Sequence, residues 1–423
     1  MKLLIENVNL FRGSKNPLSI SIDGDRIVSV GEVPEGIVFD KTIDGSNYIA
    51  LPGLVNAHTH APMTILRNVG NDLPFSDWLF KRIIPLEAKL TSDDIYYGTL
   101  LAICEMIRSG VTCFCDMYIN TENIARAISE IGIRANIAYS LITSSVRGGK
   151  EYINEEGFRD FVSSWNNKGN IKVSAEIHST YLYEKESIIE ATALIKSLGI
   201  GCHTHLSETK GEVENSISKY SMTPIEAAAS FSMFDTPTIA AHCVHPTDND
   251  LSILKENNVN VVHCPTSNLK LACGFAPVEK MLEKGINVAI GTDGAASNNN
   301  LNMFEEMHIT SLIHKGISGN PTCLNASTVL DMATINGAKA AGFSDLGEIK
   351  EGNLADIVLV DMKKPHMYPI NDLEAALIYT SQASDVDTVI VGGKILMEKG
   401  IITFCDEESI MAKVDEIHKR IVK

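Results

Sequence analysis

The sequence predicts an α/β protein: a (β/α)8 TIM-like barrel with a small β-sandwich domain formed by both termini. Between residues 56 and 350, short apolar runs typical of strands alternate with helical stretches. Histidines and one aspartate follow several of these runs, and β-rich segments with turn signals lie at both ends of the chain. One barrel of about 250 residues and a smaller module together account for the 423 residues.

The two ends of the chain resemble each other more than either resembles the middle. Residues 1–55 alternate short strand-like runs with turns, and the Asp23-Gly24 step is a hairpin signal. Residues 355–397 repeat this style, and neither end has enough strands for a stable sheet by itself. We therefore expect 1–55 plus 351–423 to form one composite β-sandwich and 56–350 to form the barrel of a metal-dependent hydrolase.

Composition and charge narrow the class of partner. The net charge of −17 argues against a nucleic-acid backbone or an anionic membrane as partner. No run of 18 or more apolar residues occurs, and the N-terminus lacks a signal-peptide pattern. Nine cysteines without a repeated framework indicate reduced thiols and a cytoplasmic location. The sequence leaves a homo-oligomer open.

The barrel rhythm can be followed along the middle of the chain. A helix is expected over Asp93–Arg108 before a strand that starts at Val111, and another over Ser187–Leu198 before Ile200–Cys202. The stretch Asn68–Ala88 is long for a connection between a strand and its helix, and it contains aromatic residues. Connections of that length near an active face usually line a pocket or form a lid.

The main chemical signal is a set of histidines and one aspartate at expected strand ends. His58 and His60 share one face at the end of the first barrel strand, and His205 and Asp293 end later strands. In a barrel, the carboxyl ends of the strands meet at one face, so these side chains should converge. Imidazole nitrogens with one carboxylate oxygen are typical zinc ligands.

The roles of four other histidines are less clearly indicated by the sequence. His203 shares the face of His205 but lies deeper, so we expect it to be a packed or hydrogen-bonded inner residue. His242 ends the next strand, where it could ligate the metal or polarise the substrate. His245 lies past the turn and is expected in solvent or around the site. His263 is expected in the core or around the site, because a further ligand would overfill it.

Two absences refine the expected chemistry. Two-metal barrels of this type need a bridging ligand, often a lysine carbamate at the end of strand four, and here Lys172 lies at the start of that strand. The sequence also lacks the His-x-Glu and Pro-Cys-x-x-Cys signature of small zinc deaminases. We therefore expect one divalent ion per chain, with zinc as the default and water in its open position.

These residues carry a resemblance to a known family. The chain resembles the amidohydrolase superfamily and, within it, the family that deaminates 5′-methylthioadenosine and S-adenosylhomocysteine. The resemblance covers nearly the whole chain, from Leu51-Pro52-Gly53 to Ala355-Asp356. The motifs more particular to this branch are Asp77-Trp78-Leu79, Pro85-Leu86-Glu87, Ile177-His178-Ser179, His205-Leu206-Ser207-Glu208-Thr209, Ala241-His242-Cys243-Val244-His245, Ser267-Asn268-Leu269-Lys270-Leu271 and Gly291-Thr292-Asp293-Gly294.

The resemblance implies roles on the substrate side. It places Glu87 on the ribose hydroxyls and His178 on the purine or the 5′ tail, while Trp78 would form a wall of the pocket. The family also has a basic tail contact in the loop before strand four, and that position falls near Asn154 here. Arg147 or Lys150 would be the substitutes for it.

The resemblance also implies a reaction. Water activated by the metal attacks C6 of the adenine ring, Asp293 accepts its proton, and His242 orients the water. Glu208 in its acid form protonates N1, and ammonia leaves a 6-oxopurine behind. The expected partner is a small purine nucleoside with a neutral or zwitterionic 5′ group.

Other functions fit part of the same pattern. A guanine deaminase or a chlorotriazine hydrolase would keep the metal residues and change the pocket, and Glu87 and the Asn298-Asn299 stretch argue against both. 5′-Deoxyadenosine as the main substrate differs only in the tail. A non-catalytic scaffold of the same fold would not need the complete set of metal and proton-transfer residues.

Overall fold

The computed structural model describes residues 1–12, 16–143 and 151–423. This part of the chain forms two compact units. One comprises Met1–Asn56, Cys104–Cys113 and Asn302–Glu407, and the other comprises Ala57–Ile103, Phe114–Leu301 and Glu408–Lys423. Among the described residues, no helix has the length and apolar character needed to cross a membrane.

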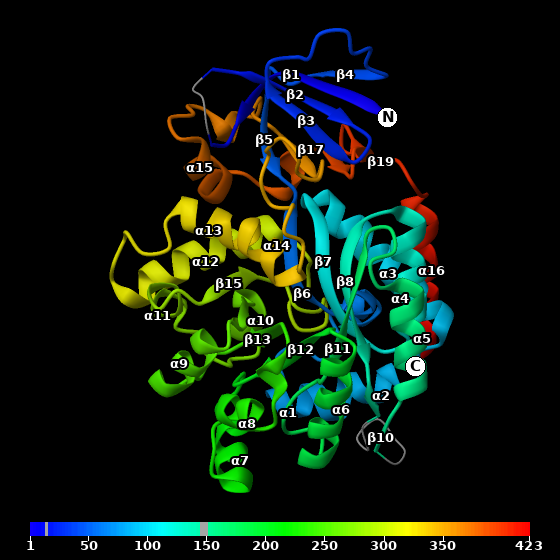
Figure 1. Cartoon of the computed structure of the whole chain (residues 1–423), viewed down its shortest axis with the longest axis vertical. Helices are drawn as coiled ribbons and strands as arrows, with labels where there is room; N and C mark the ends of the chain where they lie inside the picture. Colours follow the sequence, from blue (N-terminus) through cyan, green and yellow to red (C-terminus); the bar gives the residue numbers. More distant parts are fainter. Residues whose placement is uncertain (13–15, 144–150) are drawn as a thin grey trace. The chain divides into compact units, whose positions relative to one another are not determined.

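Eight parallel strands form the barrel that the sequence predicts. Their order in the sheet is β15-β14-β13-β12-β11-β8-β7-β6, so each strand lies beside the barrel strand that precedes or follows it in the chain (Figure 1). Several of them are buried along their whole length, as expected for strands covered on both faces. Their bounds are β6 Leu54–Thr59, β7 Val111–Tyr118, β8 Arg134–Ser140, β11 Ile171–Glu176, β12 Gly201–Leu206, β13 Thr238–His242, β14 Asn260–His263 and β15 Asn287–Ile290.

The two ends of this sheet approach each other near the candidate site. The N–H of Asp293, just past β15, donates to the carbonyl of His58 in β6 at 2.9 Å. Gly291 makes this approach possible, because a Cβ atom there would lie 2.7 Å from the backbone nitrogen of His58. The sheet is therefore nearly closed, and the first and last strands deliver their side chains to one place.

Helices follow the strands as the βα rhythm requires. The helices expected over Asp93–Arg108 and Ser187–Leu198 are α3 and α6, and their ends agree with prediction to within two residues. The main helices are α3 Ser92–Arg108, α4 Thr121–Ile131, α5 Glu155–Trp165, α6 Lys185–Ser197, α7 Lys210–Tyr220, α8 Pro224–Ser230, α9 Asp248–Glu256, α10 Pro265–Lys270, α11 Val278–Glu283, α12 Met303–Ser318, α13 Ala326–Ala333, α14 Ile335–Ala341 and α16 Glu407–Val422.

The long connection after β6 consists of short helical pieces. They are η1 Ala61–Leu66, α1 Phe75–Trp78, η2 Leu79–Ile83 and α2 Ile84–Glu87. Pro62 lies in the first turn of η1, where a missing N–H costs no hydrogen bond, and Pro85 lies directly after the π-helical piece η2. This connection brings Trp78 and Glu87 into the buried part of the molecule.

Strands from both termini form one further sheet, in the order β19-β18-β17-β16-β5-β1-β2-β3, with β4 beside β1. Its bounds are β1 Lys2–Leu10, β2 Leu18–Asp23, β3 Arg26–Gly31, β4 Lys41–Asp44, β5 Tyr48–Pro52, β16 Ile357–Asp361, β17 Val386–Val391, β18 Lys394–Glu398 and β19 Ile401–Ile402. The N- and C-terminal parts join where β5 pairs antiparallel with β16.

One hydrophobic core is shared by the two parts of this sheet. Leu3 and Ile20 from the N-terminal strands pack in the same cluster as Ile357 and Ile390 from the C-terminal ones. The expected hairpin at Asp23-Gly24 joins β2 to β3, with Gly24 at φ +62°. The prediction that the two termini together form one small β domain is thus confirmed, with their strands in one sheet, while the domain boundaries at 55/56 and 350/351 stay a prediction.

Candidate active site

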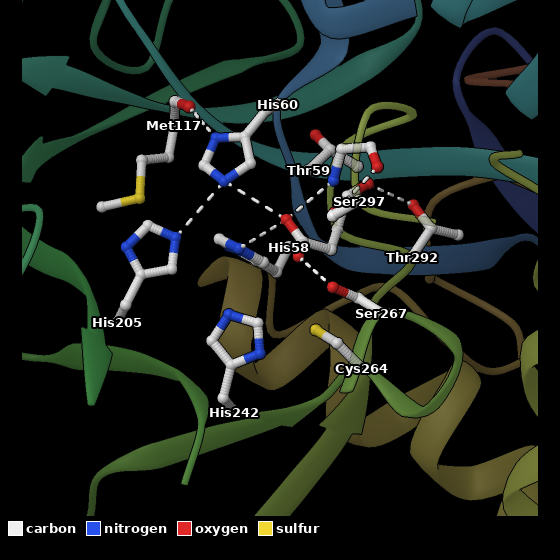
Figure 2. A network of polar contacts seen from close by, with 12 residues as sticks. His58, Thr59, His60, Met117, His205, His242, Cys264, Ser267, Thr292 and Ser297 are labelled. Atoms are coloured by element: carbon white, nitrogen blue, oxygen red, sulfur yellow. Dashed lines mark hydrogen bonds and ion pairs between the residues drawn. The ribbon is translucent and has the colours of Figure 1, made fainter. Parts of the chain in front are cut away.

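The four expected metal ligands come from three parts of the barrel. His58 lies in β6, His60 directly follows β6, His205 lies near the end of β12, and Asp293 follows β15. All four are buried. The Asp293 Oδ1 atom lies 3.5 Å from His58 Nε2 and 3.3 Å from His60 Nε2. His205 Nε2 lies 3.3 Å from His60 Nε2, and Figure 2 shows the imidazoles of His58, His60 and His205 around one space. With Asp293 beside His58 and His60, all four groups face this space.

The outer nitrogen of each imidazole is held by a partner. His60 Nδ1 donates to the Met117 carbonyl at 2.5 Å, and His205 Nδ1 donates to the His178 carbonyl at 2.9 Å. Because a carbonyl only accepts, these bonds place a proton on Nδ1, so Nε2 is the nitrogen of each ring that faces inward. His58 Nδ1 is held by His203 Nε2 at 2.9 Å. Outer bonds of this kind orient histidine ligands in metal sites.

Asp293 is held on the side away from the imidazoles. Its Oδ2 accepts from the Ser267 hydroxyl at 2.6 Å, and its Oδ1 accepts from the Gly294 N–H at 2.7 Å. The residue has a left-handed backbone with φ +62°, which is uncommon outside glycine. Two hydrogen bonds and a restricted backbone therefore fix the direction of this carboxylate.

The charges at this place favour a cation. Although burial alone lowers the pKa of His60, the hydrogen bond and charge of Asp293 raise it to about 9. Burial alone would raise the pKa of Asp293, but the imidazoles of His58 and His60 hold it well below its usual range. Burial lowers the pKa of His58 to about 4, so this imidazole is neutral.

A divalent metal fits this donor set. The buried Nε2 atom of His58 makes no hydrogen bond among the described residues, although it faces Asp293. Three imidazole nitrogens and one carboxylate oxygen are a zinc-type set. Two overlapping groups have ligand atoms within 4.8 Å of one another, namely His58 with His60 and Asp293, and His58 with His205 and His242. His242 is thus also within reach of the same space.

His242 and Glu208 lie side by side above this space. His242 Nδ1 donates to the Asn268 Oδ1 atom at 2.9 Å, so its Nε2 points inward, 3.8 Å from Glu208 Oε1. The backbone of His242 is left-handed, with φ +73°. Burial raises the pKa of Glu208, which favours the acid form of this side chain. A buried carboxyl group and a further imidazole nitrogen therefore lie next to the metal-type ligands.

The predicted substrate residues line the same cavity. Trp78 and Glu87 reach it from the long connection after β6, and His178 reaches it from the end of β11. His60, His205, Glu208, His242 and Asp293 also line it, whereas His58 is fully buried outside this set. The expectation that the connection around Asn68–Ala88 lines a pocket is confirmed.

Two buried polar atoms on this side make no hydrogen bond within the described chain. They are Glu87 Oε1 and Trp78 Nε1. Leaving a buried polar group unpaired costs on the order of 1–3 kcal/mol. A ligand with hydroxyl donors would remove the cost at Glu87, and an acceptor would do so at Trp78.

The position expected for the tail contact has another role here. Asn154 caps α5 by accepting from the Gly157 N–H at 3.2 Å, and its amide donates to the Tyr139 hydroxyl at 2.9 Å. The two basic candidates, Arg147 and Lys150, lie outside the described residues.

Several supporting residues escaped the reading of the sequence. Asn268 and Ser267 hold His242 and Asp293, although the motif that contains them was noted only as a family signature. Asp116, at the end of β7, accepts from the Thr59 hydroxyl at 2.7 Å and from the Ala61 N–H at 2.6 Å. An acid at the end of a barrel strand was the available signal for it.

The fold and this constellation agree with a known family. A model of the amidohydrolase family matches residues 49–396, and the chain belongs to that family. Adenosine-type deaminases of this family also match over most of the chain. The 5-methylthioadenosine/S-adenosylhomocysteine deaminase of Acetivibrio thermocellus is 51% identical over 386 residues, which cover 91% of this chain and 89% of that one.

Two further comparisons give the range of the similarity. The 5′-deoxyadenosine deaminase of Methanocaldococcus jannaschii is 45% identical, with 99% of each chain covered. A crystal structure of an adenosine deaminase from Xanthomonas campestris with bound zinc superimposes with a TM-score of 0.93 at 31% identity, covering 99% of this chain and 98% of that one. The resemblance noted in the sequence is confirmed.

Proposed function

We propose that the protein is a zinc-dependent aminohydrolase that removes the 6-amino group of 5′-modified adenosines. The products are the corresponding inosine analogues and ammonia. The substrates are 5′-methylthioadenosine and S-adenosylhomocysteine, with adenosine and 5′-deoxyadenosine as related candidates. This proposal is supported by relatives named for these reactions and by a zinc-bound adenosine deaminase of the same fold.

The observation that carries the proposal is the pairing of a metal-type ligand set with a buried acid in one cavity. His58, His60, His205 and Asp293 would hold the ion. Zinc, when bound, supplies Lewis acidity that makes water a sufficient nucleophile near neutral pH. Glu208 lies within 3.8 Å of His242, on the same cavity wall.

The side chains then divide the proton transfers. Asp293 accepts the proton of the attacking water, and His242, held by Asn268, orients that water and stabilises charge on the adduct at C6. Glu208 donates its proton to N1, which draws electrons out of the ring and makes C6 open to attack. The proton taken by Asp293 passes to the departing amine and ammonia leaves, while the proton of the C6 hydroxyl returns to Glu208 as the 6-oxo group forms.

The nucleoside part is recognised from the long connection after β6. The unpaired Oε1 atom of Glu87 would accept hydrogen bonds from the two ribose hydroxyls. A carboxylate there would repel a 5′-phosphate, and the acidic chain adds to this repulsion. Trp78 would cover the sugar, and His178 would contact the purine or the 5′ group.

A spectrophotometric screen tests the proposal. 5′-Methylthioadenosine, S-adenosylhomocysteine, 5′-deoxyadenosine, adenosine, AMP, free adenine and guanine would be compared at equal concentration by kcat/KM. We expect the 5′-modified nucleosides to be deaminated and AMP and free adenine to be poor substrates. Faster turnover of AMP, adenine or guanine than of 5′-methylthioadenosine would contradict the proposal.

The location of the protein is a separate proposal. All nine cysteines are free thiols, and eight of them are buried. Reduced thiols are the norm in the cytoplasm. We infer a cytoplasmic enzyme, which a cell fractionation would test.

A further inference from the structure

The segment that carries Glu208 has an unusual support. Strand β12 ends at Leu206, Ser207 has a left-handed backbone with φ +49°, and α7 begins at Lys210. From the first turn of α7, the carboxylate of Glu212 reaches back to this bend. Its Oε1 accepts the N–H of Ser207 at 2.9 Å, and its Oε2 accepts the N–H of Glu208 at 2.7 Å. One buried carboxylate thus holds two consecutive residues.

A second helix start in the chain shows the ordinary form of this spacing. In α8, the Thr223 hydroxyl accepts the Glu226 N–H at 3.1 Å, and Glu226 in turn accepts the Thr223 N–H at 2.9 Å. This reciprocal pair is a capping box, which stabilises the first turn of a helix.

At α7 the same residue types are used differently. The Thr209 hydroxyl accepts the Glu212 N–H at 3.0 Å, as a helix cap should. The Glu212 carboxylate, however, extends past the cap to Ser207 and Glu208. Its two bonds therefore support the segment before the helix, which is the segment that presents Glu208 to the cavity.

We propose that Glu212 is a positioning residue for the deamination, acting through Glu208 by holding its backbone. The inference rests on the proposed function, because it takes Glu208 as the acid that protonates N1. Glu212 does not line the cavity with the metal-type ligands. Both oxygens of the Glu212 carboxyl group accept backbone N–H donors, so the two bonds limit the movement of the bend. Small displacements of a catalytic group cost large factors in rate.

Glu212→Gln tests this role with little change in volume. An amide has one acceptor oxygen, and its NH2 group would face one of the two N–H donors, so the bend must shift. We expect kcat to fall by roughly 10- to 100-fold, in line with a displacement of about 1 Å. KM and the metal content of the protein should change much less.

A double-mutant cycle separates positioning from general damage. The variants are Glu208→Gln, Glu212→Gln and the two combined, each measured for kcat. If Glu212 acts only through Glu208, the second substitution changes kcat by less than about 2-fold once Glu208 is already replaced. If Glu212 is merely structural, the two losses multiply.

Glu226→Gln is the matched control. It removes the same kind of acid from the same Thr-x-x-Glu spacing in the next helix, but Glu226 bonds Thr223 and Asn249 and has no contact with the Glu208 bend. We expect its kcat to equal that of the wild type. Should Glu212→Gln fail to fold, Glu212→Asp keeps the charge, shortens the reach by one methylene group and is expected to give the same dependence on Glu208.

The outcomes separate this inference from the proposed function. Normal turnover in Glu208→Gln would overturn the acid role of Glu208 and this inference with it. A slow Glu208→Gln together with a normal Glu212→Gln would overturn the inference alone. Multiplicative losses in the cycle would do the same.

Discussion

The metal side and the nucleoside side of the candidate site are built in different ways. The metal side, defined as His58, His60, His205 and Asp293, lies at strand ends, and each group has a second bond on its outer side. The nucleoside side, defined as Trp78, Glu87 and His178, reaches the cavity from connections after strands.

The two sides differ in whether their buried polar atoms already have hydrogen-bond partners within the protein. On the metal side, the hydrogen bonds orient every ligand before any ion arrives. On the nucleoside side, Glu87 Oε1 and Trp78 Nε1 are buried without a hydrogen bond in the described chain. Side chains that are already oriented suit an ion that stays bound. Unpaired polar atoms suit a substrate that binds and leaves, because the hydrogen bonds that they form with it add to its affinity.

Removing an imidazole from the metal side should have the largest effect. We expect His58→Ala to lose the ion and to reduce ammonia release to background, because His58 belongs to both groups of candidate ligands. Elemental analysis should find about one ion per wild-type chain and almost none in the variant. His308→Gln is a control, since His308 bonds the Ile378 carbonyl elsewhere in the chain. Two ions per wild-type chain would contradict the single site.

Replacing the acid between the two sides should have the next largest effect. Glu208→Gln keeps the shape of the side chain but removes the proton for N1. We expect kcat to fall by roughly 10²- to 10⁴-fold, which is typical for general acid–base groups, while the metal is retained. Single-turnover rates and metal analysis would be measured on the same preparation. Near-normal turnover would show that N1 receives its proton from another group.

Removing the carboxylate of the nucleoside side should act on substrate selection. We expect Glu87→Ala to lower kcat/KM for nucleosides by an amount that corresponds to about 2–5 kcal/mol of lost transition-state stabilisation. The difference in kcat/KM between nucleosides and free adenine, which has no ribose, should become smaller. Asp77→Ala is a matched control in the same connection, because Asp77 only pairs with Lys81 at the surface. An equal loss for adenine and nucleosides would remove Glu87 from ribose recognition.

The smallest effect is expected at Trp78. Trp78→Phe keeps an aromatic wall and removes only the buried Nε1 donor. We expect KM to rise by about 2- to 10-fold, which corresponds to roughly 0.5–1.5 kcal/mol for one hydrogen bond, with kcat unchanged. Trp165→Phe is the control, because the other tryptophan donates to Glu122 in an exposed pair. An unchanged KM would mean that Trp78 only packs against the ligand.

The sequence predicted the residues of the metal side but not the residues that hold them in place. His58, His60, His205 and Asp293 could be identified because strand ends of a parallel barrel meet at one face, and that rule needs only local patterns. Asn268 and Ser267 could not, because the sequence does not tell which side chain of a helical turn will meet His242 or Asp293. The tail contact near Asn154 had no unique position in the sequence.

The sequence by itself determined the fold class, and it predicted the strand-end side chains that meet at one face and the acid Glu208 beside them, since strand periodicity and residue chemistry act locally. Only the tertiary structure decided which imidazole nitrogen faces inward, because that depends on the carbonyls of Met117 in β7 and of His178, just past β11. It also decided that Glu212 extends past its helix cap while Glu226 does not. The two acids follow threonine at the same spacing, and the difference arises from the left-handed bend at Ser207 that brings two N–H groups to one carboxylate.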